Sequence, residues 1–152
     1  MKKLFLIVIT TLCMTFTNLT FAANAAPFGL ELGVATFAQT KQQLGSKTSL
    51  SNAGTNKYSG GRMLQGNGEG LGIDGLSSIT FIFDQSDKLA AVLMKMPKSS
   101  EFGDMENGNF AKTLKALSAK YKLEVKSTPF VGDAYAKLYQ GDSIIEVTAP
   151  HH

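Results

Sequence analysis

Residues 37–50 read FAQTKQQLGSKTSL, and residues 110–123 read FAKTLKALSAKYKL. With a constant offset of 73 positions, six of the fourteen pairs are identical, and they include residues that define one face of a helix. The identical pairs are Phe37/Phe110, Ala38/Ala111, Thr40/Thr113, Leu44/Leu117, Lys47/Lys120 and Leu50/Leu123. Such spacing is typical of a short amphipathic helix that leads into an extended segment. The repeat predicts two helix-then-strands units, at about residues 28–96 and 107–149.

The first residues have the pattern of a secretory signal peptide. Lys2 and Lys3 precede an apolar run over residues 4–16, and Ala23-Asn24-Ala25 offers small residues at the positions that a signal peptidase reads. We expect a signal peptide at residues 1–25, with cuts after Ala22 or Ala23 as alternatives. The apolar run is shorter than the roughly 20 residues that a membrane-spanning helix needs. The expected product is periplasmic or secreted and has no membrane span.

Composition excludes several kinds of chemistry. The length of the expected mature protein, about residues 26–152, predicts a single domain. The only cysteine, Cys13, lies in the expected signal peptide, so we expect this domain to have neither disulfides nor cysteine-bound metals. Removal of Lys2 and Lys3 reduces the 15 basic residues to 13, against 12 acidic ones. Arg62 is the only arginine, and no basic cluster is visible. A nucleic-acid partner is therefore not expected.

The first unit is predicted to open with a strand at residues 28–33. Thr36 and Gln39 form a capping-box pattern for a helix at residues 36–44, and Gly45 supplies the stop. Residues 46–75 hold eight of the fifteen glycines, and only weak strands are expected there, near residues 47–51, 57–65 and 70–74.

A central hairpin is the strongest strand signal. Residues 78–83 and 89–96 are rich in β-branched and apolar residues, and residues 84–88 have the composition of a turn. We expect Ile79, Phe81 and Phe83 on one face, and Ile82, Val92 and Met94 on the opposite one.

The second unit is predicted to contain a helix at residues 109–121, capped by Asn107 or Asn109. Strands follow at residues 123–127, 134–139 and 143–149, the last two joined by the turn Gly141-Asp142. The chain stops where the first unit continues into its hairpin, so strand 143–149 is expected to lack a partner and to favour self-association. The predicted fold is α+β, with two short helices packed on antiparallel sheet.

The stretch GLELGVATFAQTKQQLG, residues 29–45, resembles the beta-lactamase-inhibitor-protein-like fold of small bacterial secreted proteins and outer-membrane assembly lipoproteins. That resemblance implies tandem helix-plus-sheet units that bind other proteins. It assigns a role to no individual residue.

Motifs with catalytic or metal-binding associations have simpler explanations here. Residues 70–75 match both GxGxxG and part of a calcium-binding repeat, but a strand is expected after them, and the repeat occurs once. His151 and His152 are too few for a closed metal site. The carboxylate pairs Asp84/Asp87 and Glu69/Asp74 lie in predicted turns or loops. No catalytic, cofactor-binding or metal-binding residue is predicted.

Three tyrosines lie outside the strongest core segments, Tyr58, Tyr135 and Tyr139. Tyrosine is enriched at binding hot spots, so these residues are candidates for partner binding. The favoured function is a non-catalytic binding or accessory module that recognises protein in the bacterial envelope. The first alternative is a small apolar-ligand carrier with a cavity lined by Phe81, Phe83, Val92, Met94 and Leu117. The second is a hydrolase of envelope polymers.

Overall fold

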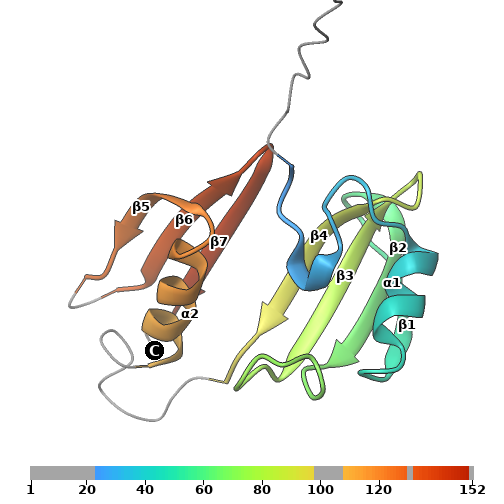
Figure 1. Cartoon of the computed structure of the whole chain (residues 1–152), viewed down its shortest axis with the longest axis horizontal. Coiled ribbons are helices and arrows are strands. Elements are labelled where there is room, and N and C mark those ends of the chain that lie inside the picture. The colour runs from blue at the N-terminus through green and yellow to red at the C-terminus, as the bar shows by residue number, and fades with distance from the viewer. Residues whose placement is uncertain (1–22, 98–107, 130–131, 151–152) are drawn as a thin grey trace, which may run out of the picture.

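The computed structural model describes residues 23–97, 108–129 and 132–150, which form two antiparallel sheets that each carry one helix (Figure 1). The strand orders are β1-β2-β3-β4 and β5-β6-β7. The elements are η1, a 3-10 helix (Pro27–Gly29), α1 (Phe37–Leu44), β1 (Leu50–Thr55), β2 (Gly60–Asn67), β3 (Ser78–Asp84), β4 (Leu89–Lys95), α2 (Asn109–Ser118), β5 (Lys122–Ser127), β6 (Ala134–Gln140) and β7 (Ser143–Ala149). The predicted α+β class is confirmed. No helix among the described residues is long and apolar enough to cross a membrane.

Helix α1 begins at a complete capping box. Thr36 Oγ1 accepts the Gln39 N–H at 3.2 Å, and Gln39 Oε1 accepts the Thr36 N–H at 2.8 Å. These two bonds satisfy donors that a helix start otherwise leaves unpaired. After the helix, a Cβ on Gly45 would lie 2.5 Å from the Lys41 carbonyl oxygen, so a side chain does not fit there. The predicted start and stop of this helix are confirmed.

The first core lies between α1 and its sheet. Ile79, Phe81 and Phe83 of β3 are fully buried on one face, as predicted, and Leu44 of α1 is buried in the same cluster. Phe37 packs the edge of its ring against Phe83, with 5.2 Å between the centroids. Helix α1 therefore packs against the large hydrophobic side chains of β3.

The second core repeats this arrangement with smaller residues. Phe110 and Leu114 of α2 pack on Ala134, Ala136 and Leu138 of β6. The helix contacts β6 and β7, and both helices lie on the nearer side of their sheets in Figure 1. The repeated phenylalanines thus both pack against the sheet of their own unit, which confirms the tandem helix-then-strands architecture.

Strand β7 has no second partner among the described residues. By order in the unit, β5, β6 and β7 correspond to β1, β2 and β3, and nothing corresponds to β4. The N–H of Ala25 donates to Ser143 Oγ at 3.0 Å, so the N-terminal segment lies beside the beginning of this edge (Figure 1). Self-association through β7 remains a prediction.

The strand predicted at residues 28–33 is wrong. Phe28, Gly29 and Gly33 have φ values of 56°, 77° and 77°, and these left-handed conformations break an extended segment into η1 and turns. The Gly33 N–H donates to the Leu89 carbonyl, and the Leu89 N–H donates to the Ala35 carbonyl, both at 2.8 Å. Residues 33–35 thereby cover the beginning of β4.

One of the three weak strands is also wrong. The strands expected near residues 47–51 and 57–65 are found as β1 and β2, each beginning three residues later than expected, but residues 70–74 lie in the loop before β3. Gly70 has φ 78°, and a Cβ there would lie 2.0 Å from the Lys47 carbonyl oxygen. These glycines are needed for a tight loop and a close backbone approach rather than for a strand.

The hairpin β3–β4 was predicted to be central in the sheet, but only β3 is an interior strand, and β4 is an edge strand. Val92 pairs with Phe81 and Met94 pairs with Ile79, so Val92 and Met94 face the core side. The prediction that they share the opposite face with Ile82 is wrong. An irregularity in the pairing just after Ile82 changes the register across the hairpin, which strand alternation cannot reveal.

Helix α2 is shorter than predicted and lacks the predicted cap. Gly108 is the N-cap and provides no side-chain hydrogen bond. Asn109 is the first helical residue, and its Nδ2 donates to the Pro97 carbonyl at 2.9 Å. The other predicted cap, Asn107, lies outside the described residues. The Asn109 side chain therefore joins the second unit to the end of the first.

Candidate functional site

The open face of the three-stranded sheet carries two of the three predicted tyrosines. Ala134, Ala136 and Leu138 are buried beneath α2, so the residues between them point to the other side of the sheet. Tyr135 and Tyr139, both half-buried, therefore lie together on the face of β6 opposite α2.

Neighbouring strands extend this face. Lys137 pairs with Val125 on β5 and with Glu146 on β7, and Tyr139 pairs with Ile144. We name this surface the tyrosine face; it consists of Val125, Tyr135, Lys137, Tyr139, Ile144 and Glu146. The exposed fractions of Val125 and Ile144 are 43% and 55%. Lys122 of β5 pairs with Tyr139, so this side of the sheet combines aromatic and branched apolar groups with the cations Lys122 and Lys137 and the anion Glu146.

Polar contacts hold the long side chains of the tyrosine face in place. Tyr135 Oη donates to Glu146 Oε1 at 3.0 Å, and Lys137 Nζ lies 5.5 Å from the centroid of the Tyr139 ring. The pKa of Tyr135 is raised, first by loss of hydration and then by the hydrogen bond to Glu146. The pKa of Lys137 is raised, mainly by a side-chain hydrogen bond with Tyr139. Near neutral pH the face therefore presents the neutral phenol of Tyr135 and the ammonium group of Lys137.

Tyr58 lies on the other unit, in the turn between β1 and β2. It is 85% exposed, and the contact described for its ring is with Lys57, whose Nζ lies 4.8 Å from the centroid. The structure does not bring Tyr58 into the tyrosine face. It serves as a natural comparison residue, since it is an exposed tyrosine outside that surface.

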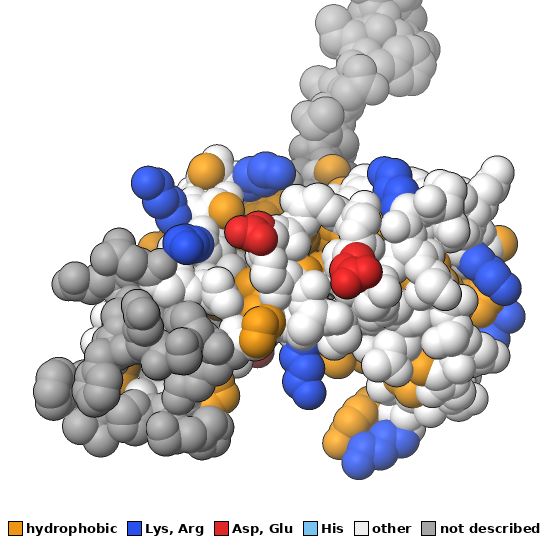
Figure 2. Space-filling view, turned by 90° about the horizontal axis from the view of Figure 1, so that it is seen from below, with side chains coloured by type: hydrophobic (Ala, Val, Ile, Leu, Met, Phe, Trp, Pro, Cys, Tyr) orange, Lys and Arg blue, Asp and Glu red, His pale blue; other side chains and the backbone are white. Residues whose placement is uncertain are grey.

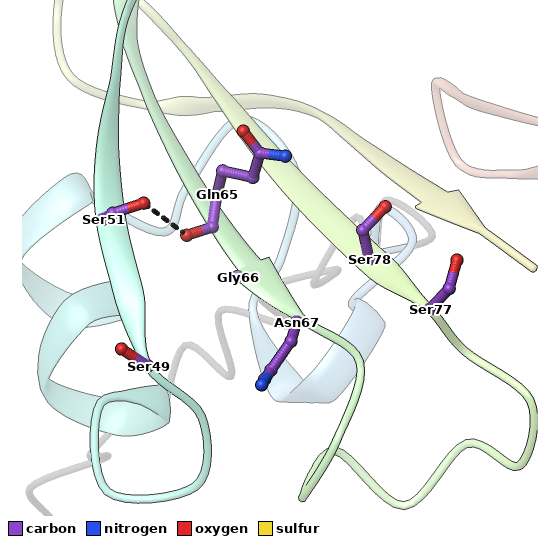
Figure 3. A pocket seen from close by; sticks show the side chains of 7 residues that line it. All are labelled: Ser49, Ser51, Gln65, Gly66, Asn67, Ser77 and Ser78. Carbon is purple, nitrogen blue, oxygen red and sulfur yellow. Dashed lines mark hydrogen bonds between the residues drawn. The ribbon is translucent and has the colours of Figure 1, made fainter.

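A polar hollow lies on the four-stranded sheet, on the side away from α1 (Figure 3). Its volume is about 410 Å³, and its lining consists of hydroxyl, amide and backbone groups without a charged side chain. The lining residues are Ser49, Ser51, Gln65, Gly66, Asn67, Ser77 and Ser78. Several of these groups already bond within the sheet: Ser51 Oγ donates to the Gln65 carbonyl at 3.3 Å, and Asn67 Oδ1 accepts from Thr48 at 2.6 Å. This hollow was not predicted from the sequence, although small polar residues recur along β1 and β2.

A groove of about 410 Å³ lies between α2 and β5. Leu123 of β5 pairs with buried Leu138, so it faces the helix side of the sheet, where it is 40% exposed. The apolar lining is formed by Phe110, Ala111, Leu114 and Leu123, and the polar lining by Lys115, Ser118 and Lys126. In the part of the chain that the structure describes, no carboxylate forms an ion pair with either lysine. The groove therefore combines an apolar floor with two lysines that form no ion pair with the described residues.

Both members of the carboxylate pair Asp84/Asp87 make contacts that stabilise the fold. Asp84 Oδ1 accepts the N–H groups of Ser86 and Lys88, both at 2.8 Å, and so shapes the β3–β4 turn. Asp87 forms an ion pair with Arg62. Across residues 23–97, 108–129 and 132–150, no group of three or more His, Cys, Asp or Glu side chains could hold a metal ion. His151 and His152 lie outside these ranges.

The glycine motif at residues 70–75 is followed by β3, whereas a nucleotide-binding loop opens a helix. Basic side chains are spread over the visible side of the molecule rather than gathered into one patch (Figure 2). Among the described residues there is thus neither a phosphate-binding helix start at this motif nor, in this view, a basic surface suited to nucleic acid.

Comparisons with known protein families, with curated proteins and with solved structures find no match. The resemblance of residues 29–45 to the beta-lactamase-inhibitor-protein-like fold therefore remains a prediction from sequence.

Proposed function

We propose that this protein is a non-catalytic binding module of the bacterial envelope and that it recognises another protein through the tyrosine face. The observation that carries the proposal is the pairing of Tyr139 with exposed Ile144, beside Val125 and Lys137, on the face of the sheet opposite α2. Rigid aromatic rings with polar tips suit protein interfaces because they bury a large area and lose little conformational entropy.

The geometry of the tyrosine face favours a protein partner over a small molecule. Its residues stand on three hydrogen-bonded strands, so the surface is broad and its backbone is preorganised. The contact between Tyr135 and Glu146 and the position of Lys137 above the Tyr139 ring limit the freedom of the side chains before binding. Such preorganisation reduces the entropy lost on association.

A crosslinking experiment tests the proposal. The exported protein carries a photo-reactive amino acid at Ile144, and crosslinked partners from an envelope extract are identified by mass spectrometry. A double variant, Tyr135→Ser with Tyr139→Ser, is compared with Tyr58→Ser, which removes an exposed tyrosine elsewhere. Since both tyrosines point away from the core, circular dichroism should show an unchanged fold.

We expect the double variant to lose affinity for the captured protein by about tenfold or more, because hot-spot residues each contribute about 1–2 kcal/mol or more. Tyr58→Ser should bind as the wild type does. Equal binding by the double variant would contradict the proposal, as would a co-purifying lipid without any protein partner.

The second candidate function is a carrier of a small amphipathic carboxylate. Phe81, Phe83 and Val92 belong to the first core and Leu117 belongs to the second, so these four described residues do not line one cavity together. The groove between α2 and β5 supports this candidate instead. Its volume lies within the range of about 300–1,000 Å³ that is usual for ligand pockets.

A fluorescent fatty acid tests the carrier function. The Lys115→Glu, Lys126→Glu double variant should bind the probe at least tenfold more weakly, because it replaces both cations near the carboxylate. Lys112→Glu is the matched control, since Lys112 is an exposed residue of α2 that does not line the groove. Absence of saturable binding to the wild type would exclude this candidate.

A further inference from the structure

Residues Ala23, Asn24 and Ala25 connect the two units of the fold. Gln140 Nε2 donates to the Ala23 carbonyl at 2.9 Å, and the Asp142 N–H donates to Asn24 Oδ1 at 2.9 Å. The buried bond from the Ala25 N–H to Ser143 Oγ completes a row of three contacts with the turn between β6 and β7. We name these three N-terminal residues the clamp.

The clamp is equally well connected to the first unit. Asn24 donates through its N–H to Glu31 Oε1 at 3.0 Å and through its side chain to the Leu32 carbonyl at 3.2 Å. The Leu32 N–H in turn donates to the Ala25 carbonyl at 3.0 Å. Ala25 itself is only 3% exposed. These residues therefore belong to the folded domain.

The hydrogen bonds of the clamp with both units bear on where the signal peptide ends. The spacing of small residues allows cuts after Ala22, Ala23 or Ala25, and the Ala-Asn-Ala pattern alone favours the last. A cut after Ala25 removes every contact of the clamp, and a cut after Ala23 removes the bond to Gln140. Only a cut after Ala22 leaves all of them.

From these contacts we propose that signal peptidase hydrolyses the bond between Ala22 and Ala23, so that the mature protein begins at Ala23 and keeps its clamp. Water adds across the amide: the Ala22 carbonyl becomes a carboxylate, and the Ala23 nitrogen becomes an ammonium group. Ala23 is exposed, and within the described residues its nitrogen makes none of the clamp bonds. The new ammonium group therefore forms without the loss of any of these bonds.

N-terminal sequencing and intact mass of the protein, exported with its own leader, test the proposal directly. We expect Ala23 as the first residue. A first residue of Asn24 or Ala26 would overturn the proposal, and so would an uncleaved leader.

A second experiment tests the clamp itself with two purified forms that begin at Ala23 and at Ala26. The shorter form should melt several degrees lower, because it lacks the buried Ala25 and its hydrogen bonds. Hydrogen exchange should show faster exchange at the amides of Leu32 and Asp142. In the longer form, Asn24→Ala should lower the melting temperature, whereas Ser49→Ala, at an exposed position without a described side-chain bond, should not. Equal melting temperatures of the two forms would overturn the role of the clamp.

Discussion

The guanidinium carbon of Arg62 lies 3.7 Å from the centroid of the Phe37 ring. The only arginine of the chain thus covers the outer side of the residue that opens the first repeat, and the edge of the same ring packs against Phe83. Arg62 also forms two hydrogen bonds with the Asp87 carboxylate. Because Arg62 and Asp87 are about half exposed, at 49% and 48%, solvent weakens their ion pair.

We predict that Arg62→Ala lowers the free energy of unfolding by about 1 kcal/mol, mainly through loss of the stacking on Phe37. Asp87→Asn should cost about 0.5 kcal/mol or less, since asparagine tolerates the φ of 60° at this position. Urea unfolding measures both changes. Both variants remove the ion pair and only Arg62→Ala removes the stacking, so equal losses would contradict the larger contribution of the stacking.

The repeated leucines should differ in their effect on stability. Leu44, the last residue of α1, is fully buried against the first sheet, whereas its counterpart Leu117 is only partly buried. Leu44→Ala should cost about 2–5 kcal/mol, because it leaves a cavity in a closed core, and Leu117→Ala should cost clearly less. Thermal unfolding followed by circular dichroism tests the order, and an equal loss at the two sites would contradict the packing described here.

A comparison of Gly70 and Gly72, two glycines of one loop, distinguishes the energetic cost of backbone strain from that of a steric clash. Gly70 and Gly72 have φ values of 78° and 74°, but a Cβ would meet the Lys47 carbonyl oxygen only at Gly70. Gly72→Ala should cost about 1–2 kcal/mol from the left-handed conformation alone. Gly70→Ala should cost substantially more, because the backbone of the neighbouring segment must move. Chemical denaturation of the two variants makes the comparison, and similar losses would mean that the loop relaxes freely.

The phenol of Tyr135 should titrate above the ordinary tyrosine pKa of about 10. Glu146→Gln should move this titration to lower pH, since it removes the negative charge that opposes ionisation. Ultraviolet absorbance of tyrosinate measures the shift, and Tyr135→Phe identifies the step that belongs to this residue. An unchanged titration in Glu146→Gln would contradict the contact.

The same pKa shift has a defined sign for stability. A folded-state pKa above that of the unfolded chain stabilises the fold at all pH values below the unfolded pKa. This contribution of Tyr135 is lost as the pH rises through the folded-state pKa. Binding through the tyrosine face should therefore not depend on Tyr135 ionisation near neutral pH.

Several features of the fold could be predicted because they depend on local chemistry. Thr36, Gln39 and Gly45 mark the first helix within the chain itself, and alternation places Tyr135 and Tyr139 on one face of a strand. The conformation of Phe28 could not be predicted, because positive φ at a non-glycine residue depends on its tertiary surroundings. Likewise, the facing of Val92 depends on a pairing irregularity between two strands.

The two hollows depend on how separate strands and helices meet. The groove beside Leu123 exists because α2 covers β6 and β7 but not β5. The polar hollow exists because Ser51 and Gln65 occupy neighbouring strands in register. Neither arrangement is encoded by spacing along one segment, which is why the sequence alone did not reveal them.

The hydrogen bond from Ala25 to Ser143 joins residues 118 positions apart in sequence. In any process that delivers the chain from its N-terminal end, such as synthesis or translocation, Ala25 appears long before its acceptor. The first sheet can assemble early from contacts that are near in sequence, whereas this closing bond has to wait for the final hairpin. Completion of the fold is therefore coupled to arrival of the last strand, so a chain interrupted before residue 143 keeps a polar amide of its first unit without its native partner.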